Sequence, residues 1–395
     1  MSAWKKCRIG DLCDTISETY KRTDNMVVLI NTSDVLEGEV LNHTPVPNEN
    51  LKGQFKKTFQ RDDILYSEIR PANKRFAFID FEDTSKYIAS TKLMVLRPRK
   101  DAVLPLFLYA ILKSRDVLEE LQHLAETRSG TFPQITFSSE LAPMEIMLPD
   151  FTTQKQIVGI LSAIEDKIRL NTAINENLEQ QAQALYRQMF VYADDNQSAT
   201  IADISLNVTD GVHNTVKDDP DGSYLLLSCK NIKGGSLNIG SGERHINKET
   251  FDKLRKRTQL AKGDILISSV GTIGEILMLN TEPTYYEFQR SVAMIKPDTE
   301  LVSPAYVYES LLYKKAELIN AAHGAVQQCL FISDISEFPI DIPSKVKLDI
   351  FNSAVIPMFE IITANNEENQ RLAALRDTLL PKLMNGEIDV SAVKI

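Results

Sequence analysis

The sequence predicts an α+β protein in which two tandem mixed α/β domains are separated by two long antiparallel coiled-coil helices, related by a pseudo-twofold axis. Three observations lead to this prediction. A heptad seam runs through residues 152–190, the same seam recurs 194 positions later, and short apolar runs typical of strands precede each copy. We therefore expect a domain at 1–150, a spacer helix at 151–193, a second domain at 194–343, and a C-terminal spacer helix and tail at 344–395.

The first globular region is predicted to combine short strands with one helix. Its helix is expected from about Pro105 to Ala125. The order of the strands within a sheet does not follow from the sequence. Runs rich in β-branched and aromatic residues predict strands at 26–31, 63–67, 76–79 and 93–96, with a last strand ending in Ile-Met-Leu-Pro at 146–149.

The stretch from Thr152 to Phe190 is predicted to be one long helix. A lone helix cannot bury a heptad seam, so the chain must supply a partner. Thr153 followed by Gln156 resembles a capping box after Pro149. The seam positions are Ile157, Leu161, Ile164, Ile168, Asn171, Asn175, Leu178, Leu185 and Met189.

The second globular region repeats the plan of the first. Asp63-Ile64-Leu65 corresponds to Asp264-Ile265-Leu266, with small changes of offset that indicate loop insertions. A helix is expected at about 304–322. Strands are expected at 224–229, 264–268, 276–279 and 292–295, with a last strand ending in Ile-Asp-Ile-Pro at 340–343.

The second seam supplies the missing partner helix. Pro357 lies inside it and is expected to kink or delay the helix, because proline removes a backbone donor and clashes with the preceding turn. Asn385-Gly386 is expected to end it. Its positions, each 194 residues after the first seam, are Phe351, Val355, Met358, Ile362, Asn365, Asn369, Leu372, Leu379 and Leu383.

The two helices are predicted to pair antiparallel. Two asparagines interrupt each seam near its midpoint, and buried asparagines that bond one another fix register. A parallel pair would also align the asparagines, so this layer alone does not decide the orientation. The duplication favours the antiparallel choice, because two tandem copies most simply complement each other through a twofold axis.

Composition and charge limit the class of protein. No apolar run approaches the ~20 residues that span a bilayer, and the N-terminus lacks an apolar signal region, so we expect a cytoplasmic protein without membrane contact. The four cysteines form no C-x-x-C pair. The formal charge is −10, and none of the four segments is basic overall. Any DNA binding would therefore come from local patches.

No chemical motif points to catalysis by this chain. An Asn/Asp-Pro-Pro-Tyr/Phe methyltransferase motif and a phosphate-binding loop are both missing, and the five histidines lack metal-ligand spacing. We expect no catalytic residue, no metal and no cofactor. An active site made of unmarked carboxylates is the alternative.

A coiled coil could simply join two unrelated domains. Two copies of one domain on a rigid spacer instead suggest measurement of a repeating object, and DNA is the obvious one. The pattern Leu148-Pro149, Gln154, Asp166 and Phe190 along the first seam resembles the central region of type I restriction-modification specificity (S) subunits. The closing segment 376–388 is similar to the end of that family. Asp210-Gly-Val-His213, Gly263-Asp-Ile-Leu266, Gly271-Thr-Ile-Gly274 and Gln289-Arg290 resemble its target-recognition signatures.

The resemblance implies two target-recognition domains, each reading one half of a bipartite asymmetric DNA target. The helices would set the spacer length and dock two modification (methyltransferase) subunits, and restriction (helicase-nuclease) subunits would join through that complex. S-adenosylmethionine, ATP and Mg would bind only to those partners. The first domain departs from the family pattern, because Arg70-Pro-Ala-Asn73 replaces Gly-Thr-Ile-Gly.

Candidate contacts to double-stranded DNA are donors near predicted turns. Arg and Lys can pair with guanine, Asn and Gln with adenine, and all of them can instead hold phosphates. The run Arg255-Lys-Arg257 could clamp phosphates or form a solvated face. The candidates are Arg70, Asn73, Lys74, Arg75, Lys92, Arg128 and Gln134 in the first domain, and His213, Lys230, Asn231, Arg244, Gln289, Arg290 and Gln327 in the second.

Two rival functions remain open at the level of sequence. A coiled-coil scaffold or decoy would bind the same partners without reading DNA. A stand-alone nuclease would need an active site that the motifs do not show.

Overall fold

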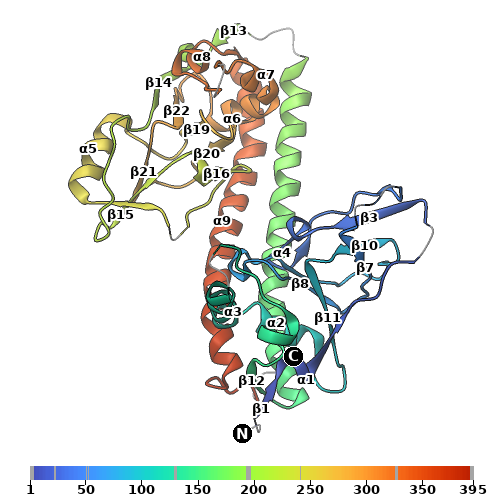
Figure 1. Ribbon diagram of the computed structural model, residues 1–395. Coiled ribbons are helices and arrows are strands. Elements are labelled where there is room, and N and C mark those ends of the chain that lie inside the picture. Colours follow the sequence, from blue (N-terminus) through green and yellow to red (C-terminus); the bar gives the residue numbers. More distant parts are fainter. Residues whose placement is uncertain are drawn as a thin grey trace. The chain divides into compact units, whose positions relative to one another are not determined.

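The computed structural model describes residues 4–21, 24–49, 51, 53–128, 131–192, 197–240, 242–324 and 328–391. The chain forms two compact units (Figure 1). Unit 1 comprises Met1–Ile168 and Gln370–Ile395, and unit 2 comprises Arg169–Asn369. Each unit thus contains one globular region with a part of each long helix. The division at 150, 193 and 343 follows the sequence repeat and stays a prediction.

Unit 1 is built from short strands in two four-stranded sheets and two smaller pairs. The sheet orders are β2-β11-β8-β9, β6-β3-β10-β7, β1-β12 and β4-β5. The elements are β1 (Lys5–Arg8), α1 (Ile9–Leu12), β2 (Cys13–Ile16), β3 (Met26–Ile30), β4 (Val35–Leu36), β5 (Glu39–Val40), β6 (Val46–Pro47), β7 (Phe55–Lys57), β8 (Ile64–Ser67), β9 (Phe76–Phe78), β10 (Tyr87–Ser90), β11 (Leu93–Pro98), α2 (Pro105–Leu112), α3 (Arg115–Arg128) and β12 (Glu145–Leu148).

Unit 2 repeats this plan. Its sheet orders are β14-β22-β19-β20, β18-β15-β21, β13-β23 and β16-β17. The elements are β13 (Gln197–Thr200), β14 (Ser205–Asp210), β15 (Tyr224–Leu227), β16 (Ile232–Lys233), β17 (Ser236–Leu237), β18 (Arg244–Ile246), α5 (Lys248–Thr258), β19 (Ile265–Ser268), β20 (Ile276–Met278), β21 (Tyr286–Phe288), β22 (Val292–Pro297), α6 (Pro304–Tyr313), α7 (Lys315–Asn320), α8 (Ile332–Ser336) and β23 (Pro339–Ile342).

The pairing of the strands shows that the repeat is structural. The sheets β2-β11-β8-β9 and β14-β22-β19-β20 are both antiparallel throughout. The second sheet contains one parallel pair in each unit, β3 with β10 and β15 with β21. Each predicted strand overlaps an observed one, so the strand predictions and the tandem duplication are confirmed.

A buried ion pair explains why the Asp-Ile-Leu motif recurs. The Asp63 carboxylate accepts from Arg97 Nε and Nη2, each at 2.8 Å. Asp264 accepts from Lys296 Nζ at 2.8 and 2.9 Å in the corresponding place. Both aspartates also accept from a backbone N–H at 2.9 Å, that of Gln60 or Ala261. Each carboxylate thus ties the start of a core strand to its neighbour, and buried charges of this kind need such partners.

The predicted single helices at 105–125 and 304–322 are corrected, because each is two helices. α2 ends at Leu112 and α6 at Tyr313. Six of the eight residues in α2 are buried, whereas α3 buries only one stripe, so the chain must turn before α3 can place that stripe on the core.

α4 comprises Phe151–Tyr186 and begins at the residue where the spacer helix was expected to start. The expected capping box at Thr153 and Gln156 is wrong. Asp150 fills the capping role, since its Oδ1 accepts from the Thr153 N–H at 2.9 Å. The buried Gln154 side chain donates to the Pro149 carbonyl and accepts from the Leu104 N–H, both at 2.9 Å, which fixes the helix to the globular region.

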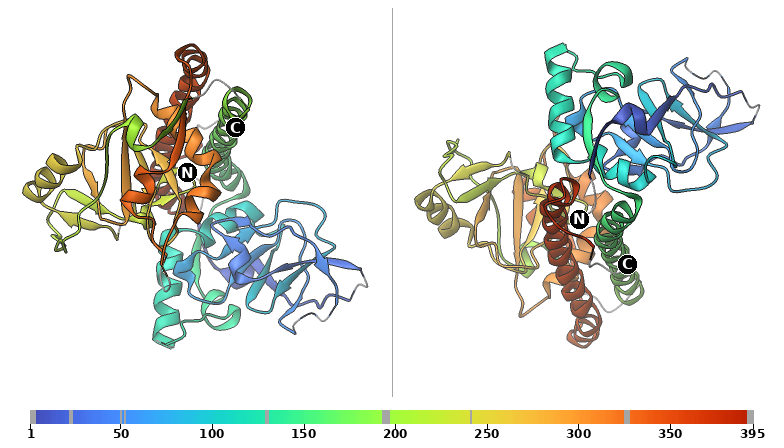
Figure 2. Two further views of the ribbon diagram at one scale, coloured as in Figure 1. Left: turned by 90° about the horizontal axis from the view of Figure 1, so that it is seen from above. Right: turned by 90° about the horizontal axis from the view of Figure 1, so that it is seen from below.

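α9 (Lys345–Met384) runs antiparallel to α4 (Figures 1 and 2). In unit 1 the start of α4, with Ile157, shares a core with Leu383 near the end of α9. In unit 2 the end of α4 meets the start of α9, where the rings of Tyr186 and Phe351 lie 6.4 Å apart. The antiparallel prediction is confirmed in both units.

Within unit 2 the asparagines of the two seams bond each other. Asn171 Nδ2 donates to Asn369 Oδ1 at 2.9 Å and to Glu368 at 2.8 Å. Asn365 Nδ2 donates to Asn175 Oδ1 at 2.8 Å. Asn175 in turn donates to Asn366 at 2.9 Å. The layer therefore includes Asn366 and Glu368, which lie outside the predicted seam.

The burial of the seam differs from a pure heptad pattern. Ile157, Leu161 and Ile164 are buried, whereas Ile168, Leu178, Leu185 and Met189 are half-buried. In α9 the residues Phe351, Val355, Ile362 and Leu383 are buried, and Met358, Asn365, Asn369, Leu372 and Leu379 are half-buried. Phe359 and Leu380 are buried beside Met358 and Leu379, because globular residues as well as α4 cover this helix.

Pro357 does not delay α9, so of the expected kink or delay the delay is wrong, and a kink stays a prediction. The helix begins twelve residues earlier, at Lys345, and continues to Met384. Burial of Leu348, Phe351 and Val355 in the core of unit 2 offsets the roughly 3 kcal/mol that an interior proline costs. Gly386, with φ of 77°, follows the end of the helix, as predicted. Within the described ranges no helix is long and apolar enough to cross a membrane.

Candidate nucleic-acid interface

Each unit brings three connecting segments together, here called the loop cluster. In unit 1 the Glu68 N–H donates to the Lys92 carbonyl at 3.0 Å, and the Ile135 N–H donates to the Glu68 carbonyl at 2.8 Å. Unit 2 repeats these bonds at 3.0 and 2.9 Å through Ser269, Ser291 and Leu330. The loop cluster comprises residues 68–75, 91–92 and 133–135 in unit 1, and residues 269–275, 289–291 and 328–330 in unit 2.

Three predicted contacts of unit 1 lie exposed on the loop between β8 and β9. They are Arg70, Asn73 and Lys74. Arg70 (φ 46°) and Lys74 (φ 52°) adopt the left-handed conformation, which costs a residue with a side chain about 1–2 kcal/mol. In unit 2 the equivalent sequence positions, counted from the ends of the flanking strands, are Gly271 and Gly274, which also have positive φ. The Gly-Thr-Ile-Gly sequence is therefore a turn requirement that unit 1 meets with basic residues.

Lys92 and Gln134 join this group. Lys92 Nζ lies 3.3 Å from Gln134 Oε1 and 3.5 Å from a Glu68 carboxylate oxygen. The backbone of Gln134 forms a bridge with Ile69, next to Arg70. The structure thus brings Arg70, Lys92 and Gln134 into one exposed cluster.

Two other predicted contacts of unit 1, the half-buried Arg75 and the exposed Arg128, bond to other groups of the protein. Arg75 Nη1 donates to the carbonyls of Ser33 and Val35 at 3.1 and 3.3 Å. Arg128 Nη1 lies 3.1 Å from a Glu140 carboxylate oxygen. The half-buried Arg75 holds the loop after β3 through Nη1, and a DNA contact by its other donors stays a prediction.

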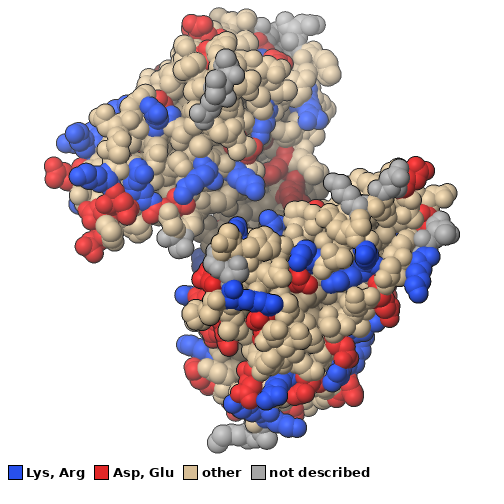
Figure 3. Space-filling view, viewed as in Figure 1, with Lys and Arg blue, Asp and Glu red and all other residues tan. Residues whose placement is uncertain are grey.

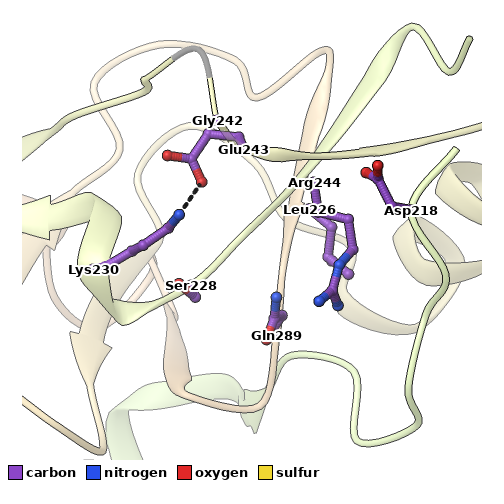
Figure 4. Close-up of a pocket in the computed structure, with 8 residues that line it drawn as sticks. All are labelled: Asp218, Leu226, Ser228, Lys230, Gly242, Glu243, Arg244 and Gln289. Carbon is purple, nitrogen blue, oxygen red and sulfur yellow. Dashed lines mark ion pairs between the residues drawn. The ribbon is translucent and has the colours of Figure 1, made fainter. Parts of the chain in front are cut away.

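In unit 2 three predicted contacts meet at one pocket of about 270 Å³ (Figure 4). Arg244 comes from β18, Gln289 follows β21, and Lys230 follows β15. Figure 4 shows the Arg244 and Gln289 side chains converging, while Lys230 points to Glu243, with Nζ and Oε2 3.0 Å apart. The remaining lining residues, which the sequence prediction missed, are Asp218, Leu226, Ser228, Gly242 and Glu243.

Asn231 is not available to DNA, and this prediction is corrected. The residue is 2 % exposed. Its Oδ1 accepts from the Ser228 N–H and its Nδ2 donates to the Asn238 carbonyl, both at 2.9 Å. Asn231 therefore closes the turn after β15, a role that aspartate or asparagine fills in many turns.

The Asp210–His213 motif shapes the backbone beside the pocket. His213 is exposed, and its Nε2 lies 2.7 Å from Asp210 Oδ2. The Val212 N–H donates to the Phe288 carbonyl and the Arg290 N–H donates to the Val212 carbonyl, both at 3.0 Å. Arg290 stands exposed beside this pairing. Gln327 lies outside the described residues.

The run Arg255–Arg257 does not form a free phosphate clamp. Arg255 bonds the buried Glu287 carboxylate and donates to the Tyr286 carbonyl at 2.9 Å. Arg257 bonds the carbonyls of Asp210 and Gly211. Burial raises the pKa of Glu287 and the Arg255 charge opposes that rise. Both arginines are structural.

The charge of the molecule does not mark an interface by itself. The visible face carries Lys and Arg interspersed with Asp and Glu (Figure 3). Across the described part of the chain, no group of three or more His, Cys, Asp or Glu side chains could hold a metal ion. The arrangement supports hydrogen bonding to a ligand surface, through small clusters of free donors on turns.

Comparison with known proteins places these features in a family. The family described as type I restriction modification DNA specificity domain matches residues 1–180 and 232–368. The chain is 32 % identical to the type I restriction enzyme HindI specificity subunit of Haemophilus influenzae, over 98 % of this chain and 100 % of that protein. It is 27 % identical to the MjaIX specificity subunit of Methanocaldococcus jannaschii, over 74 % and 71 %. The crystal structure of the type I system S subunit from M. genitalium has the same fold, with a TM-score of 0.56, 15 % identity, and 97 % and 96 % coverage.

Proposed function

We propose how this chain recognises DNA, given that it belongs to the type I restriction modification DNA specificity family and is the specificity subunit of a type I restriction-modification system. Each globular region would read one half of a bipartite asymmetric target, and α4 with α9 would set the spacer between the halves. One observation carries this proposal: two copies of one scaffold hold different polar side chains at equivalent turns. Such a pair suits a target whose halves differ.

The partners we propose follow from the same premise. Two modification subunits would dock on the long helices, and restriction subunits would join through them. We propose that this chain has no catalysis of its own, with S-adenosylmethionine, ATP and Mg bound by the partners. Family membership and the duplicated helices support two equivalent docking places. The formal charge of −10 also favours a complex in which partners supply phosphate contacts.

DNA reading can be tested with the assembled complex of this chain and its modification subunits. Wild-type complex should methylate a narrow set of bipartite sequences from a random duplex pool. Arg290→Ala should weaken the preference in one half only, because Arg290 is exposed and lacks a partner among the described residues. Lys253→Ala, which removes an exposed cation from α5, is the matched control. A complex that binds its partners but shows no sequence preference would favour the scaffold function.

The spacing role has a separate test. Four residues inserted into both α4 and α9 should lengthen the spacer by about 6 Å. The preferred gap should then grow by one or two base pairs, since base pairs rise about 3.4 Å. Insertion of four residues near Gly386, beyond α9, is the control. An unchanged gap would show that the helices do not set the spacing.

A further inference from the structure

We propose that Arg244 and Gln289 form the base-reading pair of unit 2, with Arg244 recognising a guanine and Gln289 the neighbouring base in the same half of the target. This inference rests on the proposed DNA-reading function and names the residues that perform it. It concerns the pocket of Figure 4, which lies wholly within unit 2.

The strand register explains why the two side chains meet. Arg244 lies directly opposite Leu226 on β15. On the other side of β15, the parallel pairing of Leu227 with Phe288 places Gln289 next to Ser228. Residues opposite each other share one face of a sheet, and so do residues two apart on a strand. Arg244, Leu226, Ser228 and Gln289 therefore belong to one face, and all four line the pocket.

Both side chains are free, whereas neighbouring cations are not. Neither the Arg244 guanidinium nor the Gln289 amide has a bonding partner in the part of the chain that the structure describes, although both residues are half-buried. Lys230 is neutralised by Glu243 at 3.0 Å, and Arg255 by Glu287. Half-buried donors lose much of their water, so a ligand that supplies acceptors would be bound favourably.

The pocket suits a base edge better than a phosphate. The planar guanidinium matches the O6 and N7 acceptors of guanine, and a glutamine amide offers a donor and an acceptor to a neighbouring base. Glu243 is paired with Lys230, but Asp218 places a second carboxylate on the pocket wall. Asp218 Oδ1 accepts from the His245 N–H at 2.9 Å. This carboxylate would repel phosphate oxygens, but it can accept from amino groups on bases.

Unit 1 lacks this pair. Ser90 occupies the position of Gln289, since Ala89 pairs with Ile30 as Phe288 pairs with Leu227. Continuing the register of β6 on β3 places Thr44 where unit 2 has Arg244. Small neutral side chains thus fill the pocket positions of unit 1. Of the loop-cluster cations of unit 1, only Arg70 has a side chain with no bonding partner among the described residues, because Lys74 pairs with Glu37 at 2.9 Å and Lys92 lies 3.5 Å from Glu68. The two halves of the target should therefore be read by different groups.

The test uses the complete complex with modification subunits and a pool of random DNA duplexes, with methylated sequences as the readout. Arg244→Lys keeps the charge but removes the planar fork, so preference at one position of one half-site should relax by about tenfold or more. Gln289→Ser, which installs the residue of unit 1, should relax a neighbouring position of that half-site. Lys253→Ala is the control and should leave every preference unchanged.

Three outcomes would overturn the proposal that Arg244 and Gln289 read bases. The first is that Arg244→Lys keeps the full sequence preference, and the second is that Arg244→Lys and Gln289→Ser relax different half-sites. The third is that Arg244→Ala weakens binding equally on all sequences. If the salt dependence of DNA affinity also fell by the amount that about one phosphate contact contributes, this last result would identify Arg244 as a phosphate contact instead. Wild-type complex without any preference would refute the proposed function itself, which separates the two failures. Co-purification of each variant with the modification subunits verifies that it has folded.

Discussion

The segment that joins the two sheets takes opposite forms in the two units. In unit 1 it contains β7, which pairs antiparallel with β10. In unit 2 it forms α5, whose Phe251 ring stacks 4.2 Å from the Tyr224 ring. Different contacts hold the two forms. In unit 1 Lys57 Nζ on β7 donates to the carbonyls of Thr91 and Leu93 at 3.0 and 2.8 Å. In unit 2 Asn247 caps α5 by accepting from the Thr250 N–H at 3.0 Å.

This difference changes which segment reaches the neighbouring strand edge. In unit 1 the Tyr20 N–H donates to the Lys56 carbonyl at 2.8 Å, so residues 18–20 pair with β7. In unit 2 no such strand intervenes among the described residues, and Val212 pairs directly with the turn after β21. The shared sheets therefore keep the scaffold constant, while this edge decides which donors stand free. Four predictions test that conclusion, from the largest expected effect to the smallest.

Gly211→Ala should have the largest effect. A Cβ at this position would lie 2.0 Å from the Phe288 carbonyl oxygen and 2.3 Å from that of Gln289. Both atoms are backbone, so the pairing of residues 211–212 must break, at a cost of about 5 kcal/mol in unit 2. Denaturant unfolding followed by circular dichroism would measure it. Gly53→Ala, with nothing within 4 Å of its Cβ, is the control.

Trp4 offers a check on where this destabilisation acts. It is the only tryptophan of the chain and packs in the core of unit 1. Its fluorescence transition should therefore stay near that of the wild type in Gly211→Ala. An unchanged circular dichroism transition would show that the close approach to Phe288 is not required.

Glu309→Gln should remove a pH dependence of the stability of unit 2. Burial, with the charge of Glu179, raises the pKa of Glu309 to about 8, and unit 1 has Ala110 at this position of α2. A raised carboxyl pKa means that the folded state holds its proton while the unfolded state has lost it. The free energy of unfolding is therefore highest below about pH 4.5, and it falls by on the order of 4 kcal/mol as the pH rises to 8.

The measurement compares wild type and Glu309→Gln by denaturant unfolding at pH 5, 6.5 and 8. The variant should gain most at pH 8, because the amide carries no charge to bury. Glu119→Gln, at an exposed position of α3, controls for loss of a carboxylate. Parallel stability curves for wild type and Glu309→Gln would contradict the prediction.

Arg255→Met should destabilise unit 2 by about 3 kcal/mol, because it leaves the carboxylate of Glu287 buried without its partner. Unit 1 holds Ile88 at the position of Glu287, since Leu29 pairs with Ile88 as Leu226 pairs with Glu287. The double change Arg255→Met with Glu287→Ile imitates unit 1 and should recover most of the loss. Equal stability of the single and double variants would show that the ion pair is not the cause.

Arg70→Gly should have the smallest effect, a gain of at most about 1 kcal/mol in unit 1. The gain reflects relief of a left-handed residue, reduced by the greater freedom of glycine in the unfolded chain. Trp4 fluorescence during unfolding would report it. Gly271→Arg makes the reverse change in unit 2 and should cost about 1–2 kcal/mol. A loss of stability in Arg70→Gly would mean that the arginine side chain holds the turn.

Sequence periodicity by itself determined the duplication, the strand positions and the two long helices. A seam at residues 157–189 and its copy at 351–383 require mutual burial, and short continuous apolar runs such as 292–295 are local signals of buried strands. The positive φ that Gly271 and Gly274 adopt is also a local property of a turn.

Only the tertiary structure decided which polar residues are free to bind. Asn231 and Arg244 look alike in the sequence as donors near turns. The Asn231 side chain, however, bonds the backbone of Ser228 and Asn238, while Arg244 faces an open pocket. The partner that neutralises Arg255 is 32 residues away along the chain. Side-chain pairing depends on such distant neighbours, whereas strand and helix formation depends mainly on near ones, and the fold was therefore easier to predict than the site.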